Sequence, residues 1–260
     1  MKLILLGTGG FLPTDAAQTA CYFLPEAGVM LDAGSGAYRL PEHLQRPELD
    51  IYLSHAHGDH TSGLTYLFAS YLKADWLRRG ETLGADNIAD FVRRANEALP
   101  RTRIHADEQT RAFVQPIHAY LPYQWLPLQA VEALPNGGTI TSFMMEGGTV
   151  GYRLDWPGHS LAYITDTIAR PDSAYIEKIR GVDLLLHECN GPDPLSALTE
   201  HIGHSHLSAV LRATAQAQAK RLVLIHSSPI PTLDYSADLE SVRHLFPNVE
   251  IGHDHMEIEF

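Results

Sequence analysis

The segment Ser54-His-Ala-His-Gly-Asp-His60 decides how this chain is interpreted. Within six residues it places four side chains of metal-binding type, namely His55, His57, Asp59 and His60. Imidazole and carboxylate groups are ligands that suit Zn, Mn or Fe, and their close spacing allows one turn to direct them at two adjacent ions. A solvated histidine-rich loop is the alternative, but the apolar run Ile51-Tyr-Leu53 leads directly into the segment as a short buried strand would. The segment therefore predicts a site for one or two divalent ions.

Length and composition predict a globular chain in a reducing compartment. With 260 residues, of which 45% are hydrophobic, the chain can bury one large core, or form two small domains, without disulfide support. Cys21 and Cys189 lie far apart and form no CxxC pair, so we expect two buried thiols and a cytoplasmic protein. Leu3-Ile-Leu-Leu6 is too short for a signal-peptide core, and no apolar stretch is long enough to span a membrane.

Charge limits the classes of partner. The formal net charge is -12, with 19 basic residues against 31 acidic ones and no basic run. Proteins that hold long nucleic acids usually cluster Lys and Arg against the phosphates. A small-molecule substrate is therefore favoured over a long nucleic acid, and no membrane partner is indicated.

Strand and helix patterns alternate along the chain, which predicts an α/β fold. The expected strands are short and rich in Val, Ile, Leu and Tyr, and cover residues 2–6, 29–31, 51–53, 151–155, 161–164, 182–186 and 222–225. The expected helices cover residues 62–77, 88–99, 173–179, 207–219 and 237–246. Residues 64–144 are the least patterned part of a single domain spanning 1–260. We interpret them as a partly helical insertion near the site, with ordinary scaffold as the alternative.

Polar residues recur where an expected strand stops. Strand ends meet at one edge of an open α/β sheet, where rigid strands hold side chains firmly and loops admit substrate. Any one of these residues alone is explained as a satisfied core residue, but together they predict a site. They are Asp32, His55, Asp166, His187 with Glu188, and His226.

At this point the chain resembles the metallo-β-lactamase superfamily, and within it the ribonuclease Z and cyclic-phosphate phosphodiesterase branch. The resemblance runs along nearly the whole chain except its middle, and the HxHxDH signature with downstream Asp and His is its most specific part. It is carried by Leu6-Gly-Thr-Gly9, Leu31-Asp-Ala-Gly34, the 55–60 motif, Gly151-Tyr-Arg153, Asp166-Thr167, His187-Glu188, Gly203-His-Ser205, Leu224-Ile-His226 and 254–258. The resemblance implies an αββα sandwich of two mixed β-sheets flanked by helices.

The resemblance also implies roles for the site residues. His55 and His57 would bind one metal, Asp59 and His60 the other, with Asp166 bridging both and His226 completing the second. Two such cations, Zn or Mn, make a shared water acidic and neutralise phosphate oxygens during in-line attack. Asp59 would also orient or deprotonate the resulting hydroxide.

A proton for the leaving oxygen is expected from a second pair of residues. Where similar proteins have HEAT and HST motifs, this chain has His187-Glu-Cys-Asn190 and His204-Ser-His206. We assign His204 as the general acid and Glu188 as the carboxylate that orients it, because imidazole titrates near working pH. A buried polar pair without a catalytic role is the alternative.

One position departs from the family pattern. Spacing back from Gly151 puts Met145 where a metal-binding His is expected, and a thioether is a poor ligand for Zn or Mn. The first metal would then keep His55, His57 and Asp166, with Glu146 or His159 as candidates to compensate. Occupancy by a single metal, or loss of activity, stays open.

The expected activity is hydrolysis of a small or cyclic phosphodiester by a metal-bound hydroxide. Ribonuclease Z carries a tRNA-gripping arm before the bridging Asp, and residues 154–165 are too few to form one. A lactone or ester hydrolase is the alternative enzyme, and a metal-binding protein with little turnover is the alternative outside enzymes. Assembly into a homo-oligomer stays open.

Overall fold

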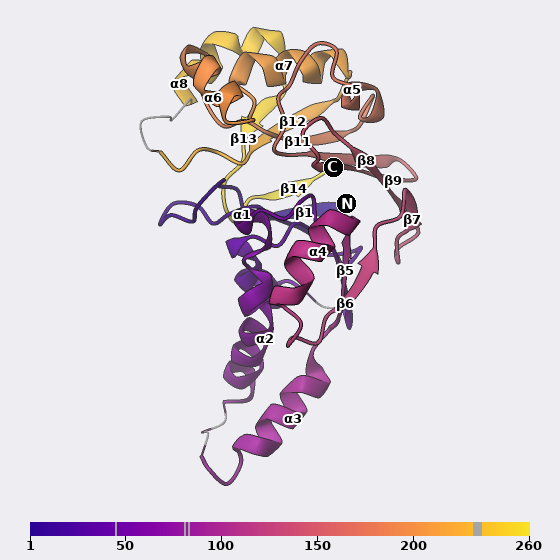
Figure 1. Ribbon diagram of the computed structural model, residues 1–260, viewed down its shortest axis with the longest axis vertical. Coiled ribbons are helices and arrows are strands. Elements are labelled where there is room, and N and C mark those ends of the chain that lie inside the picture. Colours follow the sequence, from indigo (N-terminus) through magenta and orange to yellow (C-terminus); the bar gives the residue numbers. More distant parts are fainter. Residues whose placement is uncertain (45, 81, 83, 231–235) are drawn as a thin grey trace.

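Two β-sheets stacked face to face, with helices on both outer faces, build the molecule (Figure 1). The computed structural model describes residues 1–44, 46–80, 82, 84–230 and 236–260. Each sheet has seven strands and mixes parallel with antiparallel pairs. The predicted αββα sandwich is therefore confirmed.

The first sheet is antiparallel at one side and parallel at the other. β14, β1, β2 and β3 pair antiparallel in that order, and β3 to β6 pair parallel. In spatial order the strands are β14 (Glu257–Glu259), β1 (Lys2–Gly7), β2 (Cys21–Leu24), β3 (Val29–Leu31), β4 (Glu48–Tyr52), β5 (Arg101–Ala106) and β6 (Gln124–Pro127).

The second sheet repeats this division. Strands β10 to β13 pair parallel, and strands β7 to β10 pair antiparallel. In spatial order the strands are β13 (Val249–Ile251), β12 (Arg221–Ile225), β11 (Leu184–Glu188), β10 (His159–Ile164), β9 (Val150–Trp156), β8 (Thr139–Met144) and β7 (Val131–Ala133).

Helices cover the outer face of each sheet (Figure 1). On the first sheet lie η1 (Ser35–Glu42), α2 (Leu64–Arg79) and α4 (Glu108–Ile117), which pack against it in one apolar cluster. On the second lie α5 (Tyr175–Lys178), α7 (Leu207–Gln216) and α8 (Ser236–Val242). The remaining helical segments of the described residues are α1 (Gly58–Thr61), α3 (Ile88–Ala98), η2 (Asp193–Leu195), α6 (Ser196–His201) and η4 (Arg243–Leu245).

Burial on both faces explains why the strands appear as continuous apolar runs. In β1, Leu3 and Leu5 face the core between the sheets, whereas Ile4 and Leu6 face the helices outside. Successive strand side chains point to opposite faces, so a sheet covered on both sides needs apolar residues at every position.

No helix of the described residues is long and apolar enough to cross a membrane.

All seven predicted strands are present, and the chain has further strands that the pattern did not indicate. β11 begins two residues later than predicted, at Leu184. The unpredicted elements include the strands β2, β5, β6, β7, β8 and β13 and the helical segments η1, α1, α4, η2 and α6. Strand β5 (Arg101–Ala106) contains polar and charged residues because it lies near the edge of its sheet. These residues interrupt the apolar pattern from which a strand is predicted.

The segment 64–144 contributes to both sheets. It supplies β5 and β6 to the first sheet and β7 and β8 to the second. Its helix α2 begins on the first sheet, where Leu64 and Leu67 pack in the apolar cluster, and runs away from it toward α3 at the lower end of Figure 1. Residues 81 and 83 of this segment lie outside the described residues.

Candidate metal centre

The predicted site residues follow the carboxyl ends of parallel strands in both sheets. Asp32 and His55 follow β3 and β4 of the first sheet, and Asp166 and His226 follow β10 and β12 of the second. The two groups meet where the sheets face each other. The sequence pattern predicted this meeting, because each of these residues follows the end of a strand. His187 is the exception, because its ring is bonded to the Tyr175 hydroxyl at 2.9 Å in the outer core.

Three of these residues adopt a left-handed backbone conformation. The φ angles of Asp32, Asp166 and His226 are +55°, +45° and +56°. This region is unfavourable for residues other than glycine, although Asp and His tolerate it better than most. Sharp turns at these strand ends direct the side chains into the space between the sheets, and such strain is concentrated at functional sites.

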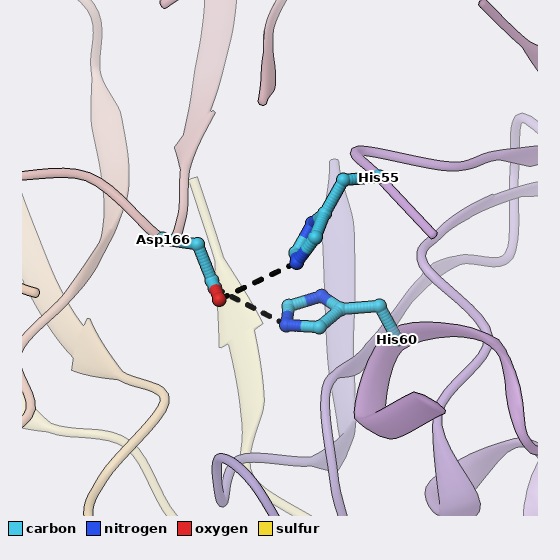
Figure 2. Close-up of side chains that lie close together, drawn as sticks. All are labelled: His55, His60 and Asp166. Carbon is cyan, nitrogen blue, oxygen red and sulfur yellow. Dashed lines mark ion pairs between the residues drawn. The ribbon is translucent and has the colours of Figure 1, made fainter. Parts of the chain in front are cut away.

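Asp166 joins the residues of the HxHxDH segment across the two sheets. Its Oδ2 atom lies 3.4 Å from His55 Nε2 and 3.7 Å from His57 Nδ1. Its Oδ1 atom lies 3.2 Å from His60 Nε2 and 3.4 Å from His226 Nε2. Figure 2 shows Asp166 pointing toward the rings of His55 and His60 from the opposite side. Each carboxylate oxygen thus faces a different pair of imidazoles.

The second group of ligand atoms is the more compact one. Asp59 Oδ2 lies 3.1 Å from His226 Nε2 and 3.5 Å from His60 Nε2. The two imidazole Nε2 atoms lie 3.1 Å apart, and both rings are buried. Together with Asp166, these residues match the expected second ligand set. The ring of His57 in the first set is more open, with 71% of its side chain exposed.

Asp32 contacts His60 at Nδ1, the ring nitrogen that does not face the other ligands. Its Oδ2 lies 2.7 Å from His60 Nδ1 and accepts hydrogen bonds from the Tyr163 hydroxyl and the Ser54 hydroxyl. Its Oδ1 accepts the Ser54 backbone N–H at 2.7 Å. A carboxylate bonded to one ring nitrogen fixes the direction of the other, which is typical of metal-binding histidines.

The donor set fits divalent cations. His55 Nε2 is buried and has no hydrogen-bond partner among the described residues, although it points at a carboxylate. Buried polar atoms are almost always paired, so an unpaired nitrogen beside Asp166 indicates a missing partner such as a metal ion. Mixed imidazole and carboxylate ligands are those preferred by Zn and Mn.

The surroundings of these side chains favour the protonation states that bind metal ions. Burial raises the pKa of Asp166, but the nearby imidazoles of His226 and His60 outweigh it and hold that pKa well below its usual range. Burial and the neighbouring His60 lower the pKa of His55, which keeps this imidazole neutral near pH 7. An ionised carboxylate and a neutral imidazole are the forms that bind metals.

His204 and Glu188 lie together beside this centre, as predicted. His204 Nδ1 is 3.1 Å from Glu188 Oε1, and the His204 ring stacks on His226 with centroids 5.1 Å apart. Glu188 is fully buried and also accepts the backbone N–H groups of Thr167 and Ser205. Burial lowers the pKa of His204, but its bond to Glu188 and the neighbouring carboxylates raise it above the ordinary value.

The turn between β8 and β9 corrects the expectation for Met145. The Met145 side chain is buried in the apolar cluster with Ile164 and Tyr175, and it is absent from the described lining of the cavities at the centre. Glu146 lines the smaller of these cavities beside His57. His159 is excluded as a compensating ligand because it begins β10, whereas Asp166 follows the end of that strand.

Two connected cavities open onto the centre. The larger has a volume of about 860 Å³ and the smaller about 290 Å³. Both are lined by four shared residues, His57, Asp166, Ile202 and His204. Four of the six predicted metal ligands, His57, Asp59, Asp166 and His226, therefore border the same space as the predicted acid, whereas His55 and His60 are buried behind them.

Residues 28–227 match the family model described as the beta-lactamase superfamily domain. The chain belongs to this family. The match contains every predicted ligand, from the HxHxDH segment to His226. The predicted family is thereby confirmed.

Curated relatives of this beta-lactamase superfamily member match 95% to 100% of its length. Ribonuclease Z of Microcystis aeruginosa is 26% identical over 313 residues, covering 100% of this chain and 96% of the relative. Ribonuclease Z of Saccharolobus solfataricus is 28% identical over 282 residues, covering 95% of each chain.

Solved structures share the fold. The metallo-beta-lactamase fold protein YhfI from Bacillus subtilis has a TM-score of 0.75 at 18% identity, covering 100% of this chain and 99% of the other. A diphosphatase from the PhnP family has a TM-score of 0.69 at 21% identity, covering 100% and 97%. At these identities the likeness concerns the fold alone.

The sequence pattern of this family member includes Asp32 among the strand-end residues that predict a site, but it assigned Asp32 no role there. It missed the contribution of Tyr163, whose hydroxyl reaches Asp32 from β10. Both sequence signals are local: an Asp directly after a strand and a Tyr within an apolar strand. Neither signal reveals that the two side chains meet across the sheets.

Proposed function

We propose that this chain is a metal-dependent phosphodiesterase that cleaves a small or cyclic phosphodiester. The observation that carries the proposal is the position of Asp166, whose two oxygens each face a separate pair of imidazoles. A carboxylate in this position suits two ions bound side by side. The ribonuclease Z relatives support phosphodiester chemistry.

The residues present would hold Zn or Mn in two sets. His55, His57 and Asp166 would hold one ion, and Asp59, His60, Asp166 and His226 the other. Bound cations of this kind acidify water and neutralise charge that develops on phosphate oxygens. Asp59 is positioned for the attacking water, because the Phe11 N–H at 2.7 Å and His226 fix its carboxylate.

His204 would supply the proton that the leaving oxygen needs. Its bond to Glu188 at Nδ1 leaves Nε2 to carry the transferred proton. Glu188 acts as a positioning residue, and its three backbone and side-chain partners hold it in place. The raised pKa of His204 keeps this imidazole protonated at higher pH than an exposed histidine.

A small substrate is favoured by the connection before Asp166. β9 and β10 form a tight hairpin, with Trp156 paired to His159 and a turn at Pro157-Gly158. No arm for a long RNA emerges between these strands. The net charge of -12 also disfavours a polyanionic partner.

An ester or lactone hydrolase is the second candidate. The larger cavity has no Lys or Arg among its described lining residues, so its only side-chain cations for a phosphate would be the histidines of the centre. The same ligands would serve ester hydrolysis.

A substrate panel with metal-loaded protein tests the proposal. Methyl para-nitrophenyl phosphate, a 2′,3′-cyclic nucleotide, a lactone and precursor tRNA should be compared at equal enzyme concentration. We expect the small or cyclic phosphodiester to be cleaved and precursor tRNA to be ignored. Specific 3′ processing of precursor tRNA would overturn the small-substrate proposal. Turnover of the lactone alone would establish the second candidate, and no turnover on a fully metal-loaded protein would indicate a metal-binding role.

A further inference from the structure

The larger cavity has an apolar wall that the proposed chemistry does not use. Its volume is about 860 Å³, and six of its described lining side chains are apolar. Four of the six are substantially exposed, with relative exposures of 78% for Phe11, 44% for Leu12, 53% for Ile202 and 52% for Ile230. The other two are Pro13 and Pro229. Exposed apolar side chains gathered around one opening indicate a binding surface.

The rest of the described lining carries no side-chain cation. Besides the residues of the centre, it consists of Gly58 and the neutral polar residues Thr19, Ser62, Asn190 and Ser228. The smaller cavity differs, because Arg170 and Glu146 line it. A charged substituent would therefore find a counter-charge only on the smaller side, whereas the larger side suits an uncharged group.

Phe11 is tied directly to the centre. Its backbone N–H donates to Asp59 Oδ2 at 2.7 Å, and its φ angle is +66°. This bond fixes the loop relative to Asp59, while the ring itself stays exposed to solvent. An apolar side chain is thus held at a set position beside the reacting atoms.

Ile202 is a second apolar residue of the cavity lining. It follows α6 and comes two residues before His204, and it lines both cavities. Its backbone N–H bonds to Leu198 O at 3.2 Å, and the His204 N–H bonds to Thr199 O at 3.0 Å. The turn that carries the proposed acid therefore also carries an apolar contact.

We infer that the substrate carries an uncharged apolar group, alkyl or aryl, which binds in the larger cavity against Phe11 and Ile202. The inference rests on the proposed function, because it names the substituent of the phosphodiester that the centre would cleave. Apolar contact with both side chains would contribute most of the specificity, since burial of each CH₂ group is favourable.

Calorimetric titration tests the inference without turnover. Metal-loaded protein should be titrated with dimethyl-, butyl(methyl)- and hexyl(methyl)phosphinic acid, monoanions in which P–C bonds replace both ester bonds of a phosphodiester and leave no ester bond to cleave. We expect the affinity to rise about twofold to fourfold for each added CH₂ group that becomes buried. A chain of equal length ending in a hydroxyl group should lose much of this gain.

Paired variants locate the effect. Ile202→Ser should flatten the dependence on chain length while dimethylphosphinic acid binds as before. Phe11→Ala should also flatten the dependence on chain length. Leu198→Ser is the matched control, because Leu198 is 51% exposed on the same helix and lies outside the described lining of either cavity. It should keep the wild-type dependence.

The outcomes separate the inference from the proposed function. An affinity independent of chain length, or an equal effect of Leu198→Ser and Ile202→Ser, would overturn the apolar subsite even if phosphodiesters are cleaved. A dependence that requires Ile202, in a protein that cleaves no phosphodiester, would support the subsite and overturn only the phosphodiesterase proposal.

Discussion

Asp32 Oδ2 lies 2.7 Å from His60 Nδ1, and both side chains are fully buried. This contact turns His60 Nε2 toward Asp59, Asp166 and His226. The arrangement fixes the ring before any ion binds, which reduces the ordering that metal binding requires.

Asp32→Asn should weaken metal binding about 10-fold to 100-fold without preventing folding. An amide is a weaker partner for the imidazole than a carboxylate, yet Asn tolerates the φ of +55° at this position. Tyr163→Phe is the matched comparison, because it removes one donor to Asp32 and leaves the contact with His60 intact. Metal-buffered titrations measure both. Equal affinity in Asp32→Asn and wild type would show that Asp32 does not position His60.

His204→Ala should slow cleavage of substrates with poor alkoxide leaving groups by about 100-fold to 10,000-fold, and nitrophenyl substrates much less. A good leaving group departs without a proton, so it does not need the acid. Metal content should be unchanged, because His55, His57, Asp59, His60, Asp166 and His226 remain. Rates across a series of leaving groups measure the effect.

Asp59→Asn is the contrasting variant and should lose both metal and turnover. Glu188→Gln should reproduce part of the His204→Ala defect with the same dependence on the leaving group, since Glu188 acts through His204. Equal losses for good and poor leaving groups in His204→Ala would instead assign His204 to substrate positioning or to the fold.

Glu146→Gln should lower the affinity of the weaker of two metal sites, because Glu146 lines the cavity beside His57. Met145→Leu should leave both sites unchanged, since Met145 packs in the apolar core and Leu conserves its volume. Glu177→Gln, on the exposed surface of α5, is the control for the loss of one negative charge. Calorimetric titration with Zn or Mn measures the affinity of each metal site in the three variants. Weakening by Met145→Leu but not by Glu146→Gln would return Met145 to the first metal site.

His105 should make the stability of the fold depend on pH. It is buried between two carboxylates, with Nε2 at 2.9 Å from Asp50 and Nδ1 at 3.1 Å from Glu132 of the other sheet. Burial lowers the pKa of His105, but these two carboxylates outweigh it and raise the pKa above 6.5. A raised folded-state pKa means stabilisation that is complete below pH 6.5 and lost as the pH rises through the folded-state pKa.

His105→Gln should therefore lower the free energy of unfolding by about 1.5 to 3 kcal/mol at pH 6 and by less at pH 9. Urea unfolding at the two pH values measures the difference. His244→Gln, at an exposed position in η4, is the control and should change stability little at either pH. A larger loss at pH 9 than at pH 6 would contradict the charged form of His105.

The sequence predicted the positions of the ligand residues better than the position of the neighbouring Met145, for a physical reason. His55, Asp166 and His226 each follow a short apolar strand, so local pattern places them at the same edge once strands pair in parallel. The position of Met145 was predicted from spacing alone, and spacing does not report which way a side chain points in the β8–β9 turn. Met145 N–H bonds to Thr149 O at 2.9 Å, and this tight turn places the Met145 side chain in the core.

The helix α4 illustrates the same limit in the middle of the chain. Its start had a recognisable signal, because Asp107 caps the Thr110 N–H at 2.9 Å. Its apolar face is short, with Val114 as a buried contact and Pro116 in the last turn. Tertiary packing against the first sheet, rather than a strong local period, maintains this helix.

Elemental analysis of untagged protein tests the central claim, that the two sheets together form a metal centre, most directly. The protein should be purified after growth in medium supplemented with Zn and Mn, beside His60→Ala and the exposed-site control His244→Ala. We predict about one to two ions of Zn or Mn per chain in the wild type and the control, and a clear loss in His60→Ala. Less than about 0.3 ion per chain in the wild type, or equal content in all three proteins, would contradict the claim.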